Sequence, residues 1–249
     1  MRTTPMRHVL SILLLALAAC GGPSNRYQGM DAPTLFAMAQ QEANEGDYDN
    51  AIQTLDRLLL AHGDWAGVPD ARLLLAEMYT VKEENLTAAA EYRRFLDRYP
   101  GHPRAADAAL GRCRAFAAES PRPERDQAFT QQAVVECANT AADFAGLPQA
   151  AEAATIAAAM REVLAEKDYL NAQFYLRRNM HDSAIKYFEF VLQRYPDSEY
   201  APLALLGIYR ANMAIGYDDL AEEARERLLA RYPESEAAAE IEAPSGDRG

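Results

Sequence analysis

The sequence predicts an all-α protein, an α-solenoid of five stacked helix pairs that would wind as a right-handed superhelix. Alanine is abundant, a quarter of the residues are charged, and alternating Val/Ile/Thr runs are absent, a composition that favours helices. Prolines and glycines cluster between apolar segments of helical period. Three segments also resemble one another, which indicates an internal repeat. They are RRFLDRYPGH at 93–102, VLQRYPDSEY at 191–200 and LLARYPESEA at 228–237.

A recurring alanine sets the register of the repeat. An alanine stands twelve residues before the proline of each of these segments. Counting back in the same way elsewhere in the chain gives five units. We expect this alanine where the two helices of a pair cross closely, because a larger side chain would push the backbones apart. A mostly large, apolar residue four positions later should fill the groove beside it. The five alanines are Ala51, Ala88, Ala133, Ala184 and Ala221.

The helix pairs follow in order along the chain. The Tyr-Pro pairs should end helices, because the residue before a proline is pushed out of the helical region. The expected pairs are 32–45 with 48–62, 68–81 with 86–99, 104–117 with 125–144, 149–178 with 182–195, and 200–215 with 217–232. We group repeats 1–3 as residues 31–145 and repeats 4–5 as 146–242. The stretch PRPERDQ at 121–127 is expected as a longer, solvated loop, and residues 243–249 as a disordered tail.

The start of the chain has the features of an export signal. Arg2 and Arg7 precede an apolar run over 9–19. This run is too short for a membrane-spanning helix, which needs about 20 residues. A positive start, a short apolar core and small residues at the exit are typical of a segment that is removed after translocation.

The exit of this segment resembles the bacterial lipoprotein box. The residues are Leu17-Ala18-Ala19-Cys20, followed by Gly21. The resemblance implies that residues 1–19 are a lipoprotein signal peptide and that 20–30 are a lipidated tether attached through Cys20. Two or more acyl chains hold a protein stably to a bilayer. Inner-membrane retention signals usually have an aspartate after the cysteine, so the resemblance implies the outer membrane. The alternative is ordinary signal cleavage that leaves a free thiol.

Charge and motifs argue against several function classes. Removing residues 1–19 takes away two of the 25 basic residues and none of the 37 acidic ones, so the mature chain carries a net charge of −14. Such a chain is unsuited to nucleic acid, whose binders need basic stripes. No HExxH, glycine-rich phosphate loop or nucleophile elbow is present in the sequence. We therefore expect no catalytic residues, metal or cofactor, although an enzyme with an unrecognised site on a helical scaffold is an alternative.

Two further cysteines fall in the third repeat. Cys113 is expected on the first helix of that pair and Cys137 on the second, so they lie on antiparallel neighbours. Their spacing matches no metal motif. A disulfide is possible in an oxidising compartment. The alternative is that Cys137, which takes the groove-filling position, is simply a small buried apolar residue.

The combined pattern resembles known families. The recurrence of alanine, aromatic residue and closing proline is similar to the tetratricopeptide repeat. A lipoprotein box followed by five such repeats resembles the BamD (ComL) family of outer-membrane assembly lipoproteins. The local stretches that carry this resemblance are FLDRYPGHP at 95–103, RDQ at 125–127 and the run over 163–202.

This resemblance implies a periplasmic scaffold, anchored to the outer membrane by its lipid, rather than an enzyme. The N-terminal repeats would bind segments of unfolded outer-membrane proteins. The C-terminal repeats would dock the barrel-forming assembly protein through its periplasmic POTRA-type domains.

One position departs from the family pattern. Members commonly carry an arginine three residues after the fourth alanine, on the docking surface, whereas this chain has Tyr187 there, beside Lys186. We expect the partner-binding surface to use Arg178, Lys186 and Tyr187. Two alternatives stay open: Tyr187 is plain packing, or the chain is another repeat lipoprotein that coordinates peptidoglycan and outer-membrane machinery.

Overall fold

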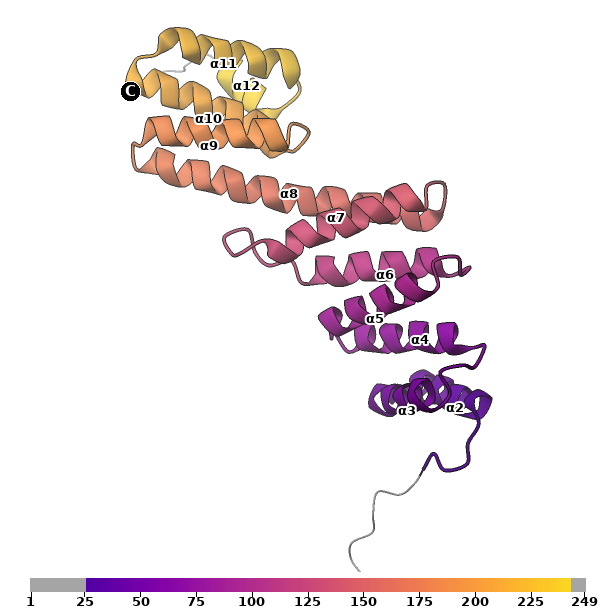
Figure 1. Ribbon diagram of the computed structural model, residues 1–249. Helices are drawn as coiled ribbons and strands as arrows, with labels where there is room; N and C mark the ends of the chain where they lie inside the picture. The colour runs from indigo at the N-terminus through magenta and orange to yellow at the C-terminus, as the bar shows by residue number, and fades with distance from the viewer. Residues whose placement is uncertain (1–25, 243–249) are drawn as a thin grey trace, which may run out of the picture. The chain divides into compact units, whose positions relative to one another are not determined.

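The computed structural model describes residues 26–242, and all regular elements in that range are α-helices (Figure 1). The expected signal peptide, Cys20 and the expected C-terminal tail lie outside the described residues. Within 26–242, none of the helices combines the length and the apolarity needed to span a membrane. The chain divides into two compact units, residues 1–68 and 69–249, which we describe separately.

In the first unit, the described residues form one antiparallel helix pair, α2 (Ala32–Asn44) and α3 (Tyr48–Ala61). Residues 26–30, expected as part of the tether, pack on this pair instead. Arg26 forms an ion pair with Glu42, a residue that is only 6% exposed. The Thr54 hydroxyl donates to the other carboxylate oxygen of Glu42 at 2.7 Å and lies 3.4 Å from the Tyr27 hydroxyl. Within the described residues, packing on the pair therefore already includes Arg26 and Tyr27.

The described part of the second unit has nine helices, and each pair packs on its neighbours within the unit in the manner of a solenoid. The helices are α4 (Val68–Val81), α5 (Asn85–Arg98), α6 (Ala105–Ala118), α7 (Ala128–Asp143), α8 (Pro148–Arg177), α9 (His181–Arg194), α10 (Tyr200–Ile215), α11 (Asp218–Arg231) and α12 (Glu236–Glu242). Helices α2 to α11 make five pairs, so the predicted all-α fold is confirmed. The short helix α12 was not expected; it packs against α10 and α11 and buries Ala237 and Ala238.

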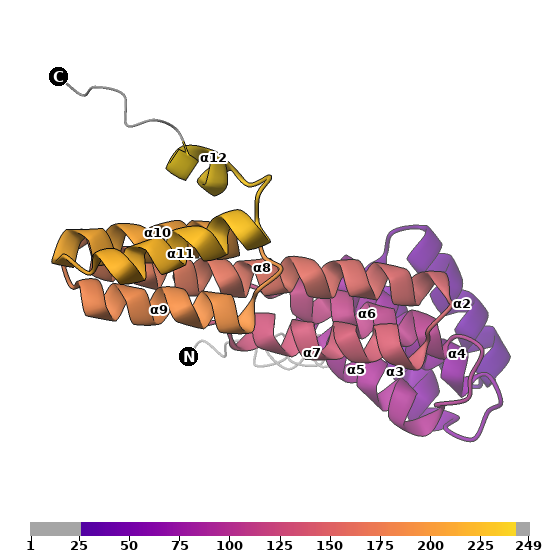
Figure 2. The ribbon, with the colours of Figure 1, turned by 90° about the horizontal axis from the view of Figure 1, so that it is seen from above.

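Helix α8 is the longest element, with 30 residues. Its first half packs against α6 and α7, where Ala153 and Ala157 join Leu110 in one apolar cluster. Its second half packs against α9 and α10, where Ala172 joins a second cluster. Figure 2 shows α8 running beside both sets of helices. The boundary expected between residues 145 and 146 falls in the loop just before this helix.

The five register alanines are all fully buried, at 0% exposure. Their groove-filling partners are buried in four units, namely Leu55, Tyr92, Cys137 and Phe188. The Tyr-Pro prediction is also confirmed: Tyr99, Tyr195 and Tyr232 are the C-caps of α5, α9 and α11. The hydroxyl of Tyr232 donates to the carbonyl of Pro196 at 2.6 Å and so links successive repeats.

In four of the helix pairs, the turn between the two helices contains a residue with a left-handed backbone conformation. Gly46 and Gly216 supply it, with φ of 81° and 78°. Glu83 and Asn179 occupy the same place in their repeats, five residues before the register alanine, with φ of 59° and 57°. Asparagine tolerates this conformation better than most residues, whereas glutamate carries the full steric cost of its Cβ. The left-handed turn is therefore kept in the two repeats that lack the glycine.

Two glycines receive the ring of the preceding repeat. A Cβ on Gly111 would lie 2.4 Å from the Tyr92 ring, and one on Gly207 would lie 2.4 Å from the Phe188 ring. In both cases the glycine follows the aromatic residue by 19 positions. The far end of the groove-filling ring therefore lies against the first helix of the next pair, where only a glycine leaves room for it.

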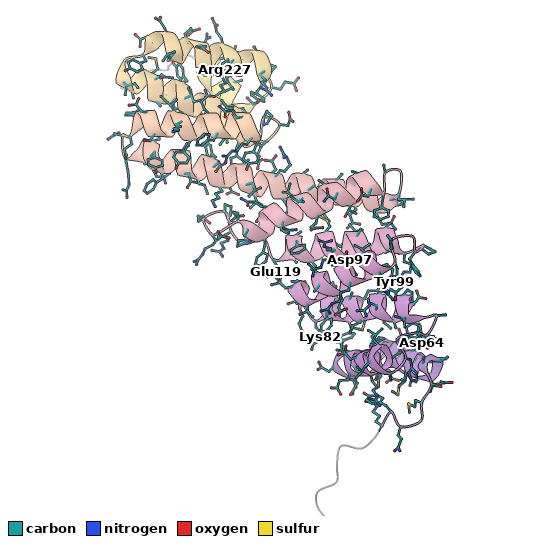
Figure 3. All side chains as sticks on the ribbon, in the orientation of Figure 1. Asp64, Lys82, Asp97, Tyr99, Glu119 and Arg227 are labelled. Atoms are coloured by element: carbon teal, nitrogen blue, oxygen red, sulfur yellow. A yellow bond between two sulfur atoms is a disulfide. The ribbon has the colours of Figure 1, made fainter. Side chains whose placement is uncertain are left out.

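The loop at 121–127 is largely exposed, as expected, but its last residue is buried. Gln127 is 1% exposed, and its amide donates to the carbonyls of Arg122 and Arg125 at 2.8 and 3.2 Å. Its amide oxygen accepts from the Thr130 hydroxyl at 2.6 Å. Nearby, Asn85 donates to Glu119 at 3.0 Å and ties the start of α5 to the end of α6 (Figure 3). The buried side chain of Gln127 thus stabilises the loop through its hydrogen bonds.

Candidate docking surface on α8 and α9

The three residues expected at the partner surface lie around the α8–α9 turn. Arg178 is the C-cap of α8, and its backbone N–H donates to the carbonyl of Tyr175 at 3.1 Å. Lys186 and Tyr187 lie in the first half of α9. Lys186 is exposed, whereas Tyr187 is partly buried. The helix register places them on neighbouring faces of α9.

Side-chain rings connect Arg178 with Tyr187. The guanidinium of Arg178 lies over the Phe174 ring, 4.2 Å from its centroid. Phe174 meets Tyr175 edge to face, with centroids 5.4 Å apart, and Tyr175 stacks on Tyr187 at 5.0 Å with an interplanar angle of 13°. We call Phe174, Tyr175, Tyr187 and Phe190 the aromatic strip.

The strip ends in a second arginine. Phe190 meets Tyr187 edge to face at 5.7 Å, and the guanidinium of Arg194 lies 5.1 Å from the Phe190 centroid. Arg194 also pairs with Asp168 at 3.4 Å. The strip therefore runs from one cation to another across two helices, so that each end combines an aromatic ring with a positive charge.

The strip is accessible in part. Phe174 is 42% exposed, Met180 in the adjoining turn is 47% exposed, and the other three rings are half-buried. Phe174 and Tyr175 belong to the last turn of α8, in the half of that helix that extends past α7 in Figure 1, and Tyr187 and Phe190 belong to α9. Since α7 stops short of this region, the strip is left without a covering helix in the described part of the chain.

Titratable groups around the strip are few. The hydrogen bond with Tyr175 raises the pKa of Tyr187. Burial raises the pKa of Asp168, although Arg194 opposes this effect. Within 26–242 neither Arg178 nor Lys186 forms an ion pair. Both cations are thus available to a partner.

This arrangement has the composition of a protein-binding surface. Aromatic residues and arginines are enriched where partners bind, because they offer large contact areas with few rotatable bonds. The sequence analysis named Arg178 and Tyr187 for this surface but not Phe190 or Arg194, which the structure places beside them. Their spacing in α9, three and seven residues after Tyr187, places them on one helix face and was a usable signal.

The remaining predicted pair lies elsewhere. Cys113 on α6 and Cys137 on α7 are joined by a disulfide, with Cα atoms 4.8 Å apart, and both are fully buried. The disulfide links the two helices of the third pair next to Leu110 and Ala153. Among the described residues, no group of three or more His, Cys, Asp or Glu side chains is arranged to hold a metal ion.

Comparisons with known proteins identify what the chain is similar to. A model of the family YfiO, described as "Outer membrane lipoprotein", matches residues 28–228. The outer membrane protein assembly factor BamD of Caulobacter vibrioides is 22% identical over 225 residues, which cover 88% of this chain and 73% of that protein.

Solved structures with similar helix arrangements include two tetratricopeptide proteins. The TPR2AB domain of yeast Sti1 is 11% identical with a TM-score of 0.45, and the match covers 81% of this chain and 78% of that one. A tetratricopeptide repeat protein from Parabacteroides merdae is 14% identical with a TM-score of 0.42, covering 90% and 73%.

Proposed function

Because this chain belongs to the YfiO family of outer membrane lipoproteins, we propose that it is a non-catalytic scaffold of the β-barrel assembly machinery. In this role it faces the periplasm from the outer membrane and assists the folding and insertion of outer-membrane β-barrel proteins. The observation that carries the proposal is the family match over residues 28–228, together with the BamD relative that covers 88% of the chain.

We propose that a lipid on Cys20 holds the scaffold at the membrane. Only residues 21–25 separate this cysteine from Arg26, which is already paired with buried Glu42. A fully extended chain spans at most about 3.6 Å per residue, so this segment reaches roughly 20 Å. The anchor would therefore keep the α2–α3 pair close to the membrane surface.

The aromatic strip is the proposed docking surface for the barrel-forming subunit. The family arginine is replaced by Tyr187, but Arg178, Arg194 and Lys186 surround the strip with positive charge. Contact would rest mainly on apolar area, so added salt should weaken it only modestly. The N-terminal repeats, residues 31–145, would bind extended segments of unfolded outer-membrane proteins.

Affinity purification of the full-length lipoprotein from detergent-solubilised membranes tests the proposal. The wild-type protein should recover the barrel-forming assembly protein. Phe174→Ala and Lys186→Glu should reduce that recovery several-fold. The matched controls are Leu60→Ala and Arg57→Glu, which change exposed residues of α3 in the same way and should leave recovery unchanged.

The possible outcomes test the assembly function and the docking surface separately. Recovery of peptidoglycan or other envelope machinery without any barrel protein would refute the assembly function and favour an envelope-coordinating lipoprotein. Recovery of the barrel protein by every variant alike would leave the function standing and refute the aromatic strip as the docking surface.

A further inference from the structure

The end of the α2–α3 pair at which α3 stops carries apolar side chains that the proposed function leaves unused. Leu60, in the last turn of α3, is 81% exposed, the highest value of any large apolar side chain within 26–242. Trp65 follows in the next turn, where its backbone N–H donates to the carbonyl of His62 at 3.1 Å. The Trp65 ring meets the ring of Phe36 of α2 with centroids 5.5 Å apart, and both side chains are partly exposed. We call Phe36, Leu60 and Trp65 the apolar end.

The repeat shows that Leu60 does not occupy a core position. Leu60 stands nine residues after the register alanine Ala51. The same position is exposed in each of the other four repeats, where it holds Asp97 (Figure 3), Ala142, Gln193 and Ala230. A single exposed leucine is ordinary on a protein surface. A solvent-facing position that becomes large and apolar in one repeat, beside a tryptophan and a phenylalanine, instead indicates a contact outside the chain.

The segment 26–30 is fixed along the same helix pair. Arg26 pairs with Glu42, and its guanidinium also donates to the side-chain oxygen of Asn50 at 3.0 Å, near the start of α3. The carbonyl of Met30 lies 3.3 Å from Nε2 of His62, at the end of α3. These contacts hold Arg26 in a defined place relative to the apolar end.

The proposed lipid anchor lies close enough for the apolar end to reach the bilayer. Residues 21–25 let Cys20 lie at most about 20 Å from Arg26. Asn50, which contacts Arg26, is separated from Leu60 by about 15 Å of helix. The two distances are similar, so a bilayer that holds a lipid on Cys20 is within reach of Leu60.

The charges of the chain indicate a contact that rests on apolar side chains. The net charge is −12, and exposed Asp64 lies just before Trp65, so an anionic surface would not be attracted. Tryptophan is enriched at the boundary between headgroups and acyl chains, because its ring is large and apolar but carries one polar N–H. A leucine beside it adds apolar area that can be buried at the same depth.

We propose that Leu60 and Trp65 insert into the periplasmic surface of the outer membrane and seat the α2–α3 pair there. This inference rests on the lipid anchor of the proposed function and specifies which part of the pair meets the bilayer. Two side chains would hold a free protein only briefly. The lipid on Cys20 keeps them beside the surface, so that the contact is intramolecular and forms at a high effective concentration.

Vesicles of brominated phosphatidylcholine test this inference with the lipidated full-length protein. Trp65 is the only tryptophan in the chain, so tryptophan fluorescence reports on the apolar end alone. Bromine atoms placed high on the acyl chains quench a tryptophan that reaches the hydrocarbon boundary but not one that stays in water. The emission of the wild-type protein should be at least twofold lower in brominated than in unbrominated vesicles, and added salt should not restore it.

Protein variants locate the contact. Leu60→Gln introduces the residue that the fourth repeat has at this position, and it should restore at least half of the lost emission. The matched control is Leu86→Gln on α5, which changes a leucine that is 46% exposed and should leave the quenching unchanged. Both side chains are exposed, so circular dichroism should show unchanged folding. Recovery of partners from detergent extracts, which contain no bilayer, should not depend on Leu60.

Flotation of the vesicles separates this inference from the anchor on which it rests. Protein that floats with both kinds of vesicle but emits equally in them would leave the anchor standing and refute the seating of the pair. Equal quenching of the wild-type protein and Leu60→Gln would refute Leu60 as part of the contact. Protein that does not float would refute the anchor and this inference together. A concentration-dependent dimer in detergent that Leu60→Gln abolishes would assign the apolar end to a second copy of this chain instead.

Discussion

Replacing Gly207 by alanine should destabilise the protein although it improves helix propensity. The new Cβ would lie 2.4, 2.5 and 2.8 Å from Cζ, Cε2 and Cε1 of Phe188, whereas carbon atoms in contact normally stay about 3.5–4.0 Å apart. The ring would have to move by about 1 Å. It has little freedom to do so, because Phe188 is fully buried and packs on Tyr169 at a centroid distance of 5.7 Å.

The expected magnitude is the difference of two effects. Overpacking a well-packed core costs about 1–3 kcal/mol. Alanine is more favourable than glycine in a helix interior by about 1 kcal/mol. We therefore expect Gly207→Ala to lower the free energy of unfolding by up to about 2 kcal/mol. Urea unfolding followed by circular dichroism should show a lower midpoint with an unchanged slope.

A double-mutant cycle identifies the ring as the cause. Phe188→Leu shortens the side chain at the point of contact, so the loss from Gly207→Ala should be much smaller in the Phe188→Leu background, with a coupling of about 1 kcal/mol or more. Gly101→Ala is the control, because a Cβ there has no neighbour within 4 Å. Stabilisation by Gly207→Ala, or strict additivity in the cycle, would refute the close packing of ring on glycine.

Two further perturbations test other features of the second unit. Replacing Cys113 and Cys137 together by alanine should lower the free energy of unfolding by about 3 kcal/mol, because the disulfide closes a loop with a sequence separation of 24. A reducing agent should lower the thermal midpoint of the wild-type protein but not that of the variant. Glu83→Gly should raise the free energy of unfolding by about 0.5–1 kcal/mol, because glycine adopts the left-handed backbone conformation at φ 59° without steric cost. Glu83→Ala keeps the Cβ and should not raise it. Equal urea midpoints for the two variants would contradict this explanation.

The proposed docking surface illustrates how far the sequence could predict the arrangement of these residues. Arg178 and Tyr187 could be identified because a family pattern marks that region, and the departure at Tyr187 was visible in the residues. Their connection through Phe174 and Tyr175 could not be identified, since stacking of Tyr175 on Tyr187 depends on the crossing of two helices around the α8–α9 turn. The extension of α8 beyond α7, which leaves the strip uncovered, also depends on packing.

The sequence by itself determined the helices of this protein and their pairing. Local rules carry that information: apolar residues at helical spacing, an alanine at the crossing, and a tyrosine before proline at the end. The buried Ala51, Ala88, Ala133, Ala184 and Ala221 follow from these rules alone.

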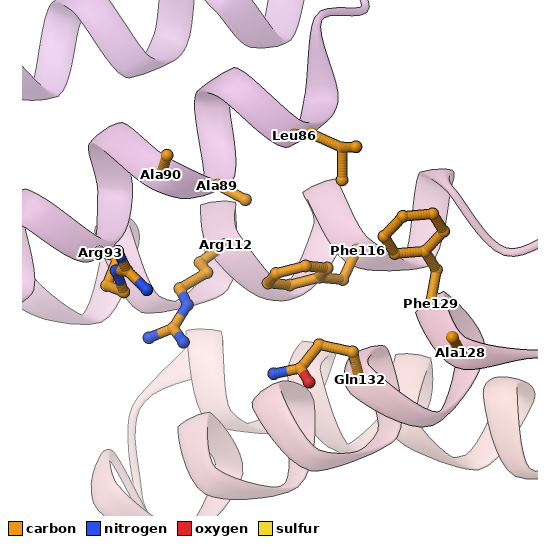
Figure 4. A pocket seen from close by; sticks show the side chains of 9 residues that line it. All are labelled: Leu86, Ala89, Ala90, Arg93, Arg112, Phe116, Ala128, Phe129 and Gln132. Atoms are coloured by element: carbon orange, nitrogen blue, oxygen red, sulfur yellow. The ribbon is translucent and has the colours of Figure 1, made fainter.

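Only the tertiary structure decided which distant side chains meet and which stay free. Phe188 meets Gly207 through the stacking of one pair on the next, and Cys113 meets Cys137 because their helices are adjacent at that level. Arg93 of α5 has no ion pair among residues 26–242 and lines a pocket together with Arg112 of α6 and Phe129 of α7 (Figure 4). Contacts of this kind depend on distances between elements, and a pattern repeated along one chain fixes the spacing within a helix but not the separation between helices.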